Sequence, residues 1–228
     1  EGHPPNYRYV GRHRRTKEGG RFVTGRGQFV QDLQLPGMLH VALVQSPYAR
    51  ARLGAIDSGQ ALASPGVVAV VSGEEIAAHI SPLLQGIDAP GVRAWPLAHE
   101  MVRYAGEWVA VVVAGTRYQA EDAAELVEVD YQELPAAVDP EAALDDEAPL
   151  VHPAHGSNVM LHKNFTWGPV ADDFAAAPRK LTYQVRWGRS SGVPIETFGV
   201  VARWQESQGI LEIWASIQMP QYQEQIAA

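Results

Sequence analysis

The 228-residue sequence predicts an α+β fold on the strength of two patterns. A valine-rich strand, a short helix and a second strand follow one another between Met101 and Pro135. From Leu181 onward, apolar and polar residues alternate instead, which is typical of antiparallel strands with one buried face. At this length, and with 46% hydrophobic residues, the chain can bury a substantial core, and we expect two domains.

The segment Met101–Pro135 is the most readable part of the chain. Its run Trp108–Ala114 is wholly apolar and too short for an ordinary helix, so it predicts a strand buried on both faces. Thr116 and Gln119 have capping-box spacing and predict the start of a helix. Alternation from Val127 to Tyr131 predicts a second strand. If the two strands are parallel neighbours, the crossover between them should be right-handed.

Upstream of this segment, the sequence predicts a polar arm followed by short strands and helical turns. Residues 1–20 form the arm, and a turn at 24–27 precedes the stretch 28–33. Ser72 and Glu75 repeat the capping-box spacing ahead of a short helix. The expected elements are strands at 38–44, 52–56 and 67–71, helical turns at 60–63 and 76–80, and a proline- and glycine-rich loop at 81–96.

The C-terminal third has a different character. Residues 136–158 are acidic and contain prolines, as expected of a solvated connection between domains. Strand-like runs at 181–187, 199–204 and 210–215 predict an antiparallel sheet of at least three strands. A turn at Met219-Pro220 leads into a helical pattern at 221–228, and this open sheet leads us to expect a continuation supplied elsewhere.

Charge and cysteine content restrict the function classes. The formal net charge of −8 argues against a nucleic-acid partner, although Arg8, Arg12, Arg14 and Arg15 form a local basic cluster. The chain has no cysteine, which excludes disulfides and thiolate-ligated zinc or iron–sulfur clusters within it. It has no run of about 18 apolar residues, so we expect no membrane span and a cytoplasmic location. A periplasmic location stays open because the chain starts without methionine.

Several candidate motifs have a simpler structural explanation. Gly25-Arg26-Gly27 lacks the third glycine and the strand–helix context of a nucleotide-binding loop, so a turn is the favoured interpretation. His152 and His155 lack a further ligand nearby, and a surface loop is favoured over a zinc site.

Two further groups of residues also have a simpler structural explanation. The acidic residues Asp145, Asp146 and Glu147 lack the glycine-centred loop of a calcium site and predict a solvated edge. The serines considered as nucleophiles lack the sharp strand-to-helix turn of a hydrolase; these are Ser46, Ser190 and Ser191.

Gln218 is a more specific candidate. It lies where the strand-like run ending in Trp214-Ala215 gives way to a turn, a position from which side chains project at the rim of a sheet. Its amide offers a hydrogen-bond donor and an acceptor without carrying charge. The alternative is an ordinary polar loop residue.

The chain resembles the molybdenum-containing hydroxylases of the xanthine dehydrogenase, aldehyde oxidase and aerobic carbon monoxide dehydrogenase type. The resemblance is to the N-terminal part of their molybdopterin-binding large subunit and runs from about Tyr9 to the end of the chain. It rests on the ordered segments RFVTGRGQFVQDLQLPGMLHVALVQSPYARARL, ALASPGVVAVVSGEEI, PLAHEMVRYAGEWVAVVVAGTRYQAEDAAELVEVDYQELPAAVDPEAAL, PIETFGVVARW and WASIQMPQY.

This resemblance implies four parts for the chain. They are an N-terminal arm at 1–20, an α/β hammerhead domain at 21–145, a linker at 146–160, and the first, mainly antiparallel part of a molybdenum-cofactor-binding domain at 161–228.

The resemblance also implies roles for two residues. The family's matching glutamine donates a hydrogen bond to the apical oxo ligand of molybdenum, which would make Gln218 both catalytic and cofactor-binding. Glu196 matches a family glutamate near the cofactor, with a structural role as the equal alternative. The family's histidines are absent from Ser46–Ala51, and its glycine-rich cofactor segment and general base are absent from this chain.

By this resemblance, the chain is the N-terminal portion or a split subunit of a hydroxylase that oxidises an aldehyde or N-heterocycle with water-derived oxygen. The implied cofactor is molybdopterin cytosine dinucleotide with molybdenum. The implied partners are a second molybdenum-subunit chain, a 2Fe-2S subunit and an FAD subunit. Two alternatives are a non-catalytic scaffold or assembly module derived from this family and a part of an aerobic carbon monoxide dehydrogenase.

Overall fold

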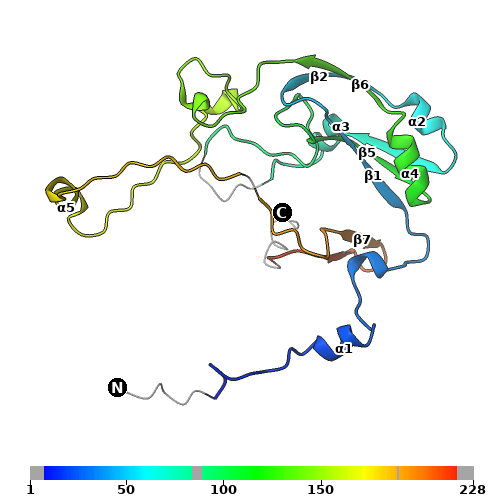
Figure 1. Ribbon diagram of the computed structural model, residues 1–228. Helices are drawn as coiled ribbons and strands as arrows, with labels where there is room; N and C mark the ends of the chain where they lie inside the picture. Colours follow the sequence, from blue (N-terminus) through cyan, green and yellow to red (C-terminus); the bar gives the residue numbers. More distant parts are fainter. Residues whose placement is uncertain (1–7, 84–88, 189, 220–228) are drawn as a thin grey trace. The chain divides into compact units, whose positions relative to one another are not determined.

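The structure of the chain is a computed structural model that describes residues 8–83, 89–188 and 190–219 (Figure 1). Contacts divide these residues into two compact units. The central unit comprises residues 37–185, and the terminal unit joins residues 8–36 to residues 186–219. The predicted helix at 221–228 lies outside the described residues.

The central unit holds two three-stranded sheets and several short helices. One sheet has the order β1-β5-β3 and the other the order β4-β2-β6. The strands are β1 (His40–Gln45), β2 (Ala51–Asp57), β3 (Val67–Ser72), β4 (Met101–Val102), β5 (Trp108–Ala114) and β6 (Glu128–Glu133). The helices are α2 (Gly59–Ala63), α3 (Gly73–Ala77), α4 (Arg117–Ala124), η2 (Ala142–Leu144), η3 (Pro153–His155) and α5 (Val170–Ala176).

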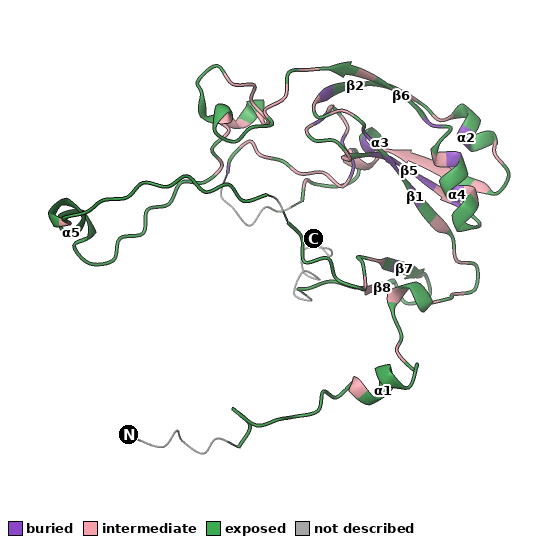
Figure 2. Ribbon diagram, in the orientation of Figure 1, coloured by how far each residue is buried: buried purple, intermediate pink, exposed green. Residues whose placement is uncertain are grey.

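Strand β5 is the centre of the first sheet and of the core. It pairs antiparallel with β1 on one side and with β3 on the other. Val109, Ala110, Val112 and Ala114 are fully buried, whereas Val111 and Val113 are partly buried, so the prediction of a strand enclosed on both faces is confirmed in part. Figure 2 shows the buried residues gathered on β1, β5 and α4.

Both predicted cap residues begin helices, and the pair Ser72 and Glu75 forms a complete capping box. The Thr116 hydroxyl accepts the backbone N–H of Gln119 at 3.3 Å and begins α4, whose Ala120 and Ala123 are buried. Ser72 accepts the N–H of Glu75 at 3.3 Å, and the Glu75 carboxylate accepts the N–H of Ser72 at 2.7 Å. These hydrogen bonds lower the pKa of Glu75.

The strands flanking α4 are not parallel neighbours, so the condition for a right-handed crossover is not met. β5 lies in the first sheet, whereas β6 pairs antiparallel with β2 in the second. The helix therefore connects two sheets instead of crossing over one. Apolar side chains of both sheets, including Val112 of β5 and Val129 of β6, meet in one cluster between them.

The terminal unit is built around one hairpin. It contains α1 (Gly19–Val23), η1 (Val30–Asp32), β7 (Val200–Gln205) and β8 (Ile210–Ala215). β7 and β8 pair antiparallel in continuous register from Val200 opposite Ala215 to Gln205 opposite Ile210. These two strands confirm the predicted runs, but the expected third strand is missing from the sheet.

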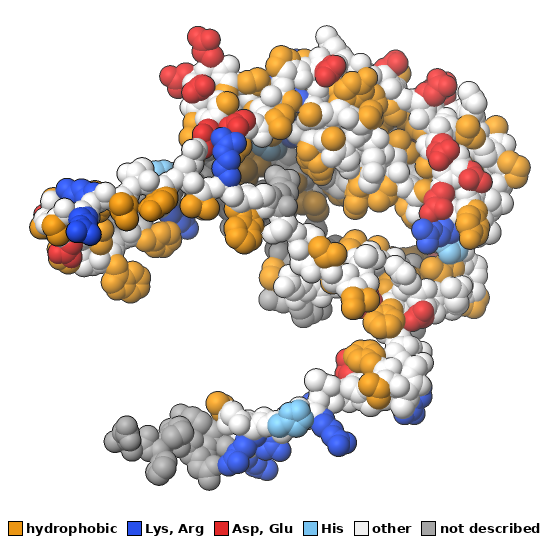
Figure 3. All heavy atoms as spheres, in the orientation of Figure 1, with side chains coloured by type: hydrophobic (Ala, Val, Ile, Leu, Met, Phe, Trp, Pro, Cys, Tyr) orange, Lys and Arg blue, Asp and Glu red, His pale blue; other side chains and the backbone are white. Residues whose placement is uncertain are grey.

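The third strand, predicted at 181–187, does not form in the described residues. The apolar members of its alternation are instead between 76% and 85% exposed; they are Leu181, Tyr183, Val185 and Trp187. Figure 3 shows apolar side chains gathered on the extended part of the central unit that carries α5. Alternation specifies which face of a strand is apolar, but a strand also needs a neighbour to pair with.

Candidate functional site

The end of β8 carries Gln218, the principal candidate residue. The strand ends at Ala215, and the exposed Gln218 follows in a bend. Its side chain has no hydrogen-bond partner among the residues that the structure describes. An exposed amide at this point is available to donate to or accept from a group outside the hairpin.

Ser216 fixes the backbone just before Gln218. Its hydroxyl accepts the N–H of Gly199 at 2.9 Å and donates to the carbonyl oxygen of Thr197, also at 2.9 Å. The N–H of Ser216 donates to the carbonyl of Gly199 at 3.0 Å. The sequence analysis missed this residue, because serine near a strand end carries no distinctive spacing.

Glu196 precedes Thr197, whose carbonyl accepts the hydrogen bond from Ser216. The backbone N–H of Val30 donates to its carboxylate at 3.2 Å, and the side chain of Gln31 donates to the hydroxyl of Thr197 at 3.3 Å. The structure thus shows Glu196 holding η1 against the segment that leads into β7. The structural role of Glu196 is thus supported by its hydrogen bond with Val30, whereas the cofactor role that the resemblance implies stays a prediction.

A cross-strand ion pair links β7 and β8 in the hairpin that carries Gln218. The guanidinium of Arg203 on β7 donates through Nε to the carboxylate of Glu212 on β8 at 2.8 Å. Hydrogen bonds from Gln205 and then from Arg203 lower the pKa of Glu212. Because these groups lie at the surface, we assign the pair an orienting role and no large share of stability.

The glycine pair at 25–27 and the histidine loop are structural elements. Gly25 has φ of +69° in a turn that follows α1, so the glycine pair succeeds a helix, which does not fit a nucleotide-binding loop. His155 places its two ring nitrogens 2.6 Å from the carbonyl oxygen of Pro90 and 3.1 Å from that of Val159. The loop that carries His152 and His155 therefore has a structural role, because His155 contacts the backbone of two other segments.

The remaining alternatives also have structural explanations. Ser46 is buried, and its hydroxyl accepts the N–H of Tyr48 at 3.1 Å. The acidic residues Asp145, Asp146 and Glu147 are exposed, as expected of a solvated edge. Within the described ranges, no group of at least three histidine, aspartate or glutamate side chains is arranged to hold a metal ion.

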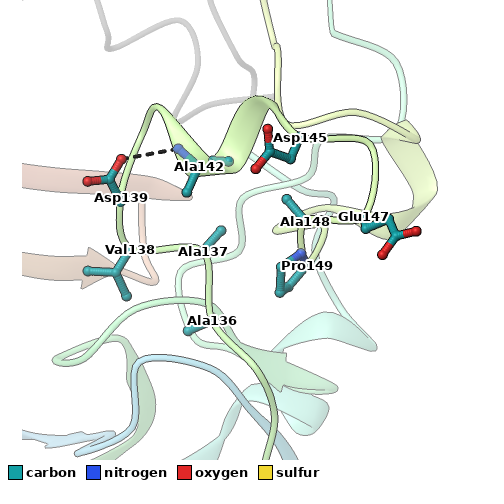
Figure 4. A pocket seen from close by; sticks show the side chains of 10 residues that line it. Ala136, Ala137, Val138, Asp139, Ala142, Asp145, Glu147, Ala148 and Pro149 are labelled. Atoms are coloured by element: carbon teal, nitrogen blue, oxygen red, sulfur yellow. Dashed lines mark hydrogen bonds between the residues drawn. The ribbon is translucent and has the colours of Figure 1, made fainter.

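A pocket of about 400 Å³ lies in the connection after β6 (Figure 4). It is lined largely by alanines between Ala136 and Pro149, with Asp145 and Glu147 among the lining residues. The carboxylate of Asp139 accepts the N–H groups of Glu141 and Ala142 at 2.8 and 3.1 Å and so caps η2. The pocket brings no catalytic combination of side chains together.

Two family models match the chain in sequence order. Residues 24–135 match the aldehyde oxidase and xanthine dehydrogenase a/b hammerhead domain. Residues 151–228 match the molybdopterin cofactor-binding domain. Across the described residues, no helix has the length and hydrophobicity to cross a bilayer.

Curated relatives match almost the whole chain. It is 38% identical to the carbon monoxide dehydrogenase large chain of Hydrogenophaga pseudoflava, covering 90% of this chain and 27% of that one. It is 33% identical to the nicotine 6-hydroxylase large subunit of Paenarthrobacter nicotinovorans, covering 90% and 25%. The chain therefore spans about a quarter of the length of these relatives.

Solved structures show the same fold. Quinoline 2-oxidoreductase from Pseudomonas putida 86 superposes with a TM-score of 0.82 at 39% identity, covering 90% of this chain and 26% of that one. Carbon monoxide dehydrogenase from Oligotropha carboxidovorans superposes with a TM-score of 0.78 at 35% identity, covering 94% and 28%. At least nine tenths of this chain thus has a structural counterpart in each of these larger enzymes.

Proposed function

Since this chain belongs to the molybdenum hydroxylase family of xanthine dehydrogenase, aldehyde oxidase and carbon monoxide dehydrogenase, we propose that it is the N-terminal portion or a split subunit of such an enzyme. The observation that carries this proposal is the ordered match of a hammerhead domain and the start of a molybdopterin-binding domain. A second polypeptide segment then completes the cofactor-binding domain.

The residues at the end of β8 suit a hydrogen-bonding role toward the cofactor better than metal ligation. Gln218 presents an uncharged amide, and no cluster of ligating side chains accompanies it in the parts of the chain that are described. When bound, the molybdopterin cofactor supplies the redox chemistry of the reaction. Gln218 would donate a hydrogen bond to the apical oxo ligand, while Ser216 holds the backbone that presents it.

The proposed reaction is oxidation of an aldehyde or an N-heterocycle with oxygen derived from water. Support for an N-heterocycle comes from the nicotine 6-hydroxylase and quinoline 2-oxidoreductase among the similar proteins. The cytosine dinucleotide form of the cofactor, with 2Fe-2S and FAD groups on companion subunits, completes the proposed enzyme. Cytoplasmic location is part of the same proposal.

Carbon monoxide oxidation is the second candidate. Identities of 38% and 37% to two carbon monoxide dehydrogenase large chains favour it. A third candidate, a scaffold without a metal site, would retain the fold and lose the chemistry.

The test is purification of the chain with its associated polypeptides, followed by measurement of molybdenum and of sedimentation size. We expect a heteromeric complex that contains molybdenum and reduces a dye with an aldehyde or quinoline. Reduction with carbon monoxide alone would select the second candidate. A complex without metal would select the scaffold, and a lone 24.8 kDa species without metal would contradict the proposal.

A further inference from the structure

The central unit contains a large cleft that is lined only by residues of that unit. Its volume is about 1020 Å³. Strands β2 and β4 contribute to it, together with the loop around Gly91–Trp95 and the loop at His152–Ala154. Gly91 has φ of +85°, and a Cβ there would lie 2.4 Å from the carbonyl oxygen of Ala154. This close backbone approach brings the two loops together.

Positive charge dominates the lining of the cleft. Its charged residues are Arg50, Arg52, Arg93, Arg103, Glu74 and Glu100, an excess of two positive charges. The chain as a whole has a formal net charge of −8, so the cleft opposes the overall charge of the molecule. Clustered cations in a concave surface raise the local concentration of anionic groups.

The arginines have few acceptors within the chain. Arg103 donates to the carbonyl of Met101 at 3.2 Å, with a long ion pair of 3.9 Å to Glu107, and Arg50 donates to the carbonyl of Pro135 at 2.8 Å. The Nε atoms of Arg50 and Arg103 are buried without a hydrogen-bond partner. The side chains of Arg52 and Arg93 make no hydrogen bond or ion pair with any described residue.

The walls between the arginines favour a peptide over a small inorganic anion. Leu53, Trp95, Met101 and Leu134 supply apolar surface along the same cleft. A phosphate ion would occupy a small part of this volume and leave these walls exposed. A peptide with carboxylates and intervening apolar side chains can engage both kinds of surface, and guanidinium groups bind carboxylates with two parallel hydrogen bonds.

We propose that the arginine-lined cleft docks an acidic segment of the polypeptide that completes the molybdenum subunit, an inference that rests on the proposed function. Charge complementarity selects an acidic segment. The completing polypeptide is the expected source because the matched relatives hold nearly three quarters of their length outside the matched part, with 27% inside it. Docking therefore joins the hammerhead to the rest of its subunit.

Carbodiimide cross-linking of the purified complex tests the docking directly. The reagent condenses a lysine amine with a carboxylate to form an amide, with the oxygen of the carboxylate leaving on the urea by-product. R52K and R93K keep the positive charge and introduce an amine into the cleft. R117K is the matched control, because Arg117 pairs with Glu121 at 2.8 Å on α4 and is outside the cleft.

Mass spectrometry should find R52K and R93K linked to acidic residues of the completing polypeptide, and R117K linked to Glu121. The charge reversal Arg52→Glu with Arg93→Glu should weaken association by about tenfold or more, with little effect from Arg179→Glu. An unchanged unfolding midpoint of the isolated double variant would show that it still folds.

The outcomes separate this inference from the proposed function. Links confined to Glu74 or Glu100, in a complex that contains molybdenum, would overturn the docking and leave the enzyme assignment intact. Links to an iron–sulfur or FAD polypeptide would overturn the identity of the occupant. Absence of both molybdenum and a completing polypeptide would count against both proposals.

Discussion

The hydroxyl of Ser216 donates a hydrogen bond to the carbonyl oxygen of Thr197 at 2.9 Å. The same hydroxyl accepts the N–H of Gly199 at 2.9 Å, so the side chain of Ser216 ties the end of β8 to the chain entering β7. Gln218 is the second residue after this tie. The position of the proposed cofactor-facing amide thus depends on a neighbouring hydroxyl.

Replacing Ser216 with alanine should loosen this part of the hairpin. The N–H of Gly199 and the carbonyl of Thr197 would both lose a partner, at a cost of about 0.5–1.5 kcal/mol in unfolding free energy, because water can reach these partly exposed groups. Threonine keeps the hydroxyl, so Ser216→Thr should recover part of the loss. Urea denaturation measures the difference. Equal stability of the wild type and Ser216→Ala would contradict the clamp.

Replacing Gln218 with alanine should affect turnover in the assembled enzyme far more than assembly. The side chain is exposed and makes no hydrogen bond within the described residues, so its loss removes little from the fold. A lost hydrogen bond at a metal site typically costs about 10- to 100-fold in activity.

Steady-state kinetics and molybdenum content of the complex measure this effect together. Gln208→Ala, at another exposed glutamine in the β7–β8 turn, is the matched control. A Gln218→Ala enzyme with full metal content and wild-type rates would show that the amide does not serve the cofactor.

Gly73 should not tolerate a side chain. It is buried at the start of α3, and a Cβ there would lie 2.0 Å from the carbonyl oxygen of Ala98. Because that neighbour is backbone, Gly73→Ala should cost about 1–3 kcal/mol in unfolding free energy. Gly115→Ala is the control, since its nearest neighbour would be the flexible Gln119 side chain at 3.4 Å. Comparable denaturation midpoints for the two variants would be inconsistent with this packing.

The stability of the central unit should depend on His152 as pH falls. Burial, followed by the positive charges of Arg103 and His155, lowers the pKa of His152 below its ordinary value of 6.5. Protonation therefore costs more in the folded state than in the unfolded state. The contribution to stability is fully present above the ordinary pKa and is lost as pH falls through the lower folded value.

Thermal unfolding between about pH 7 and pH 5 measures this dependence across the titration range of histidine. His152→Gln should flatten the profile, whereas His162→Gln, at an exposed position, should leave it unchanged. Identical profiles for the wild type and His152→Gln would exclude a contribution from this side chain.

Local sequence patterns were sufficient for individual elements. The run Trp108–Ala114 coincides with β5 because continuous apolar residues of that length have few alternatives to a buried strand. Thr116 and Ser72 form the predicted caps because a cap depends on neighbours three residues away. The ordered family segments also predicted the hammerhead and cofactor-domain matches.

Pairing between distant segments was beyond these patterns. Periodicity at 181–187 specified an apolar face but not a partner, and the segment is extended and exposed. For the same reason the sequence left open whether β5 and β6 are neighbours, because alternation does not say which sheet a strand joins.

The sequence by itself determined β1, β2, β3, β5 and β6 with the caps of the central unit, and the absence of cysteine chemistry; the resemblance it carries selected Gln218 and Glu196 as residues to test. The tertiary structure decided which strands share a sheet. It also decided that Glu196 accepts a hydrogen bond from the N–H of Val30, and that Ser216 holds the backbone two residues before Gln218. It also gathered arginines from separate segments into one cleft. Short-range hydrogen bonds and periodicity are encoded within a few residues, whereas these contacts depend on how segments far apart in the chain pack together.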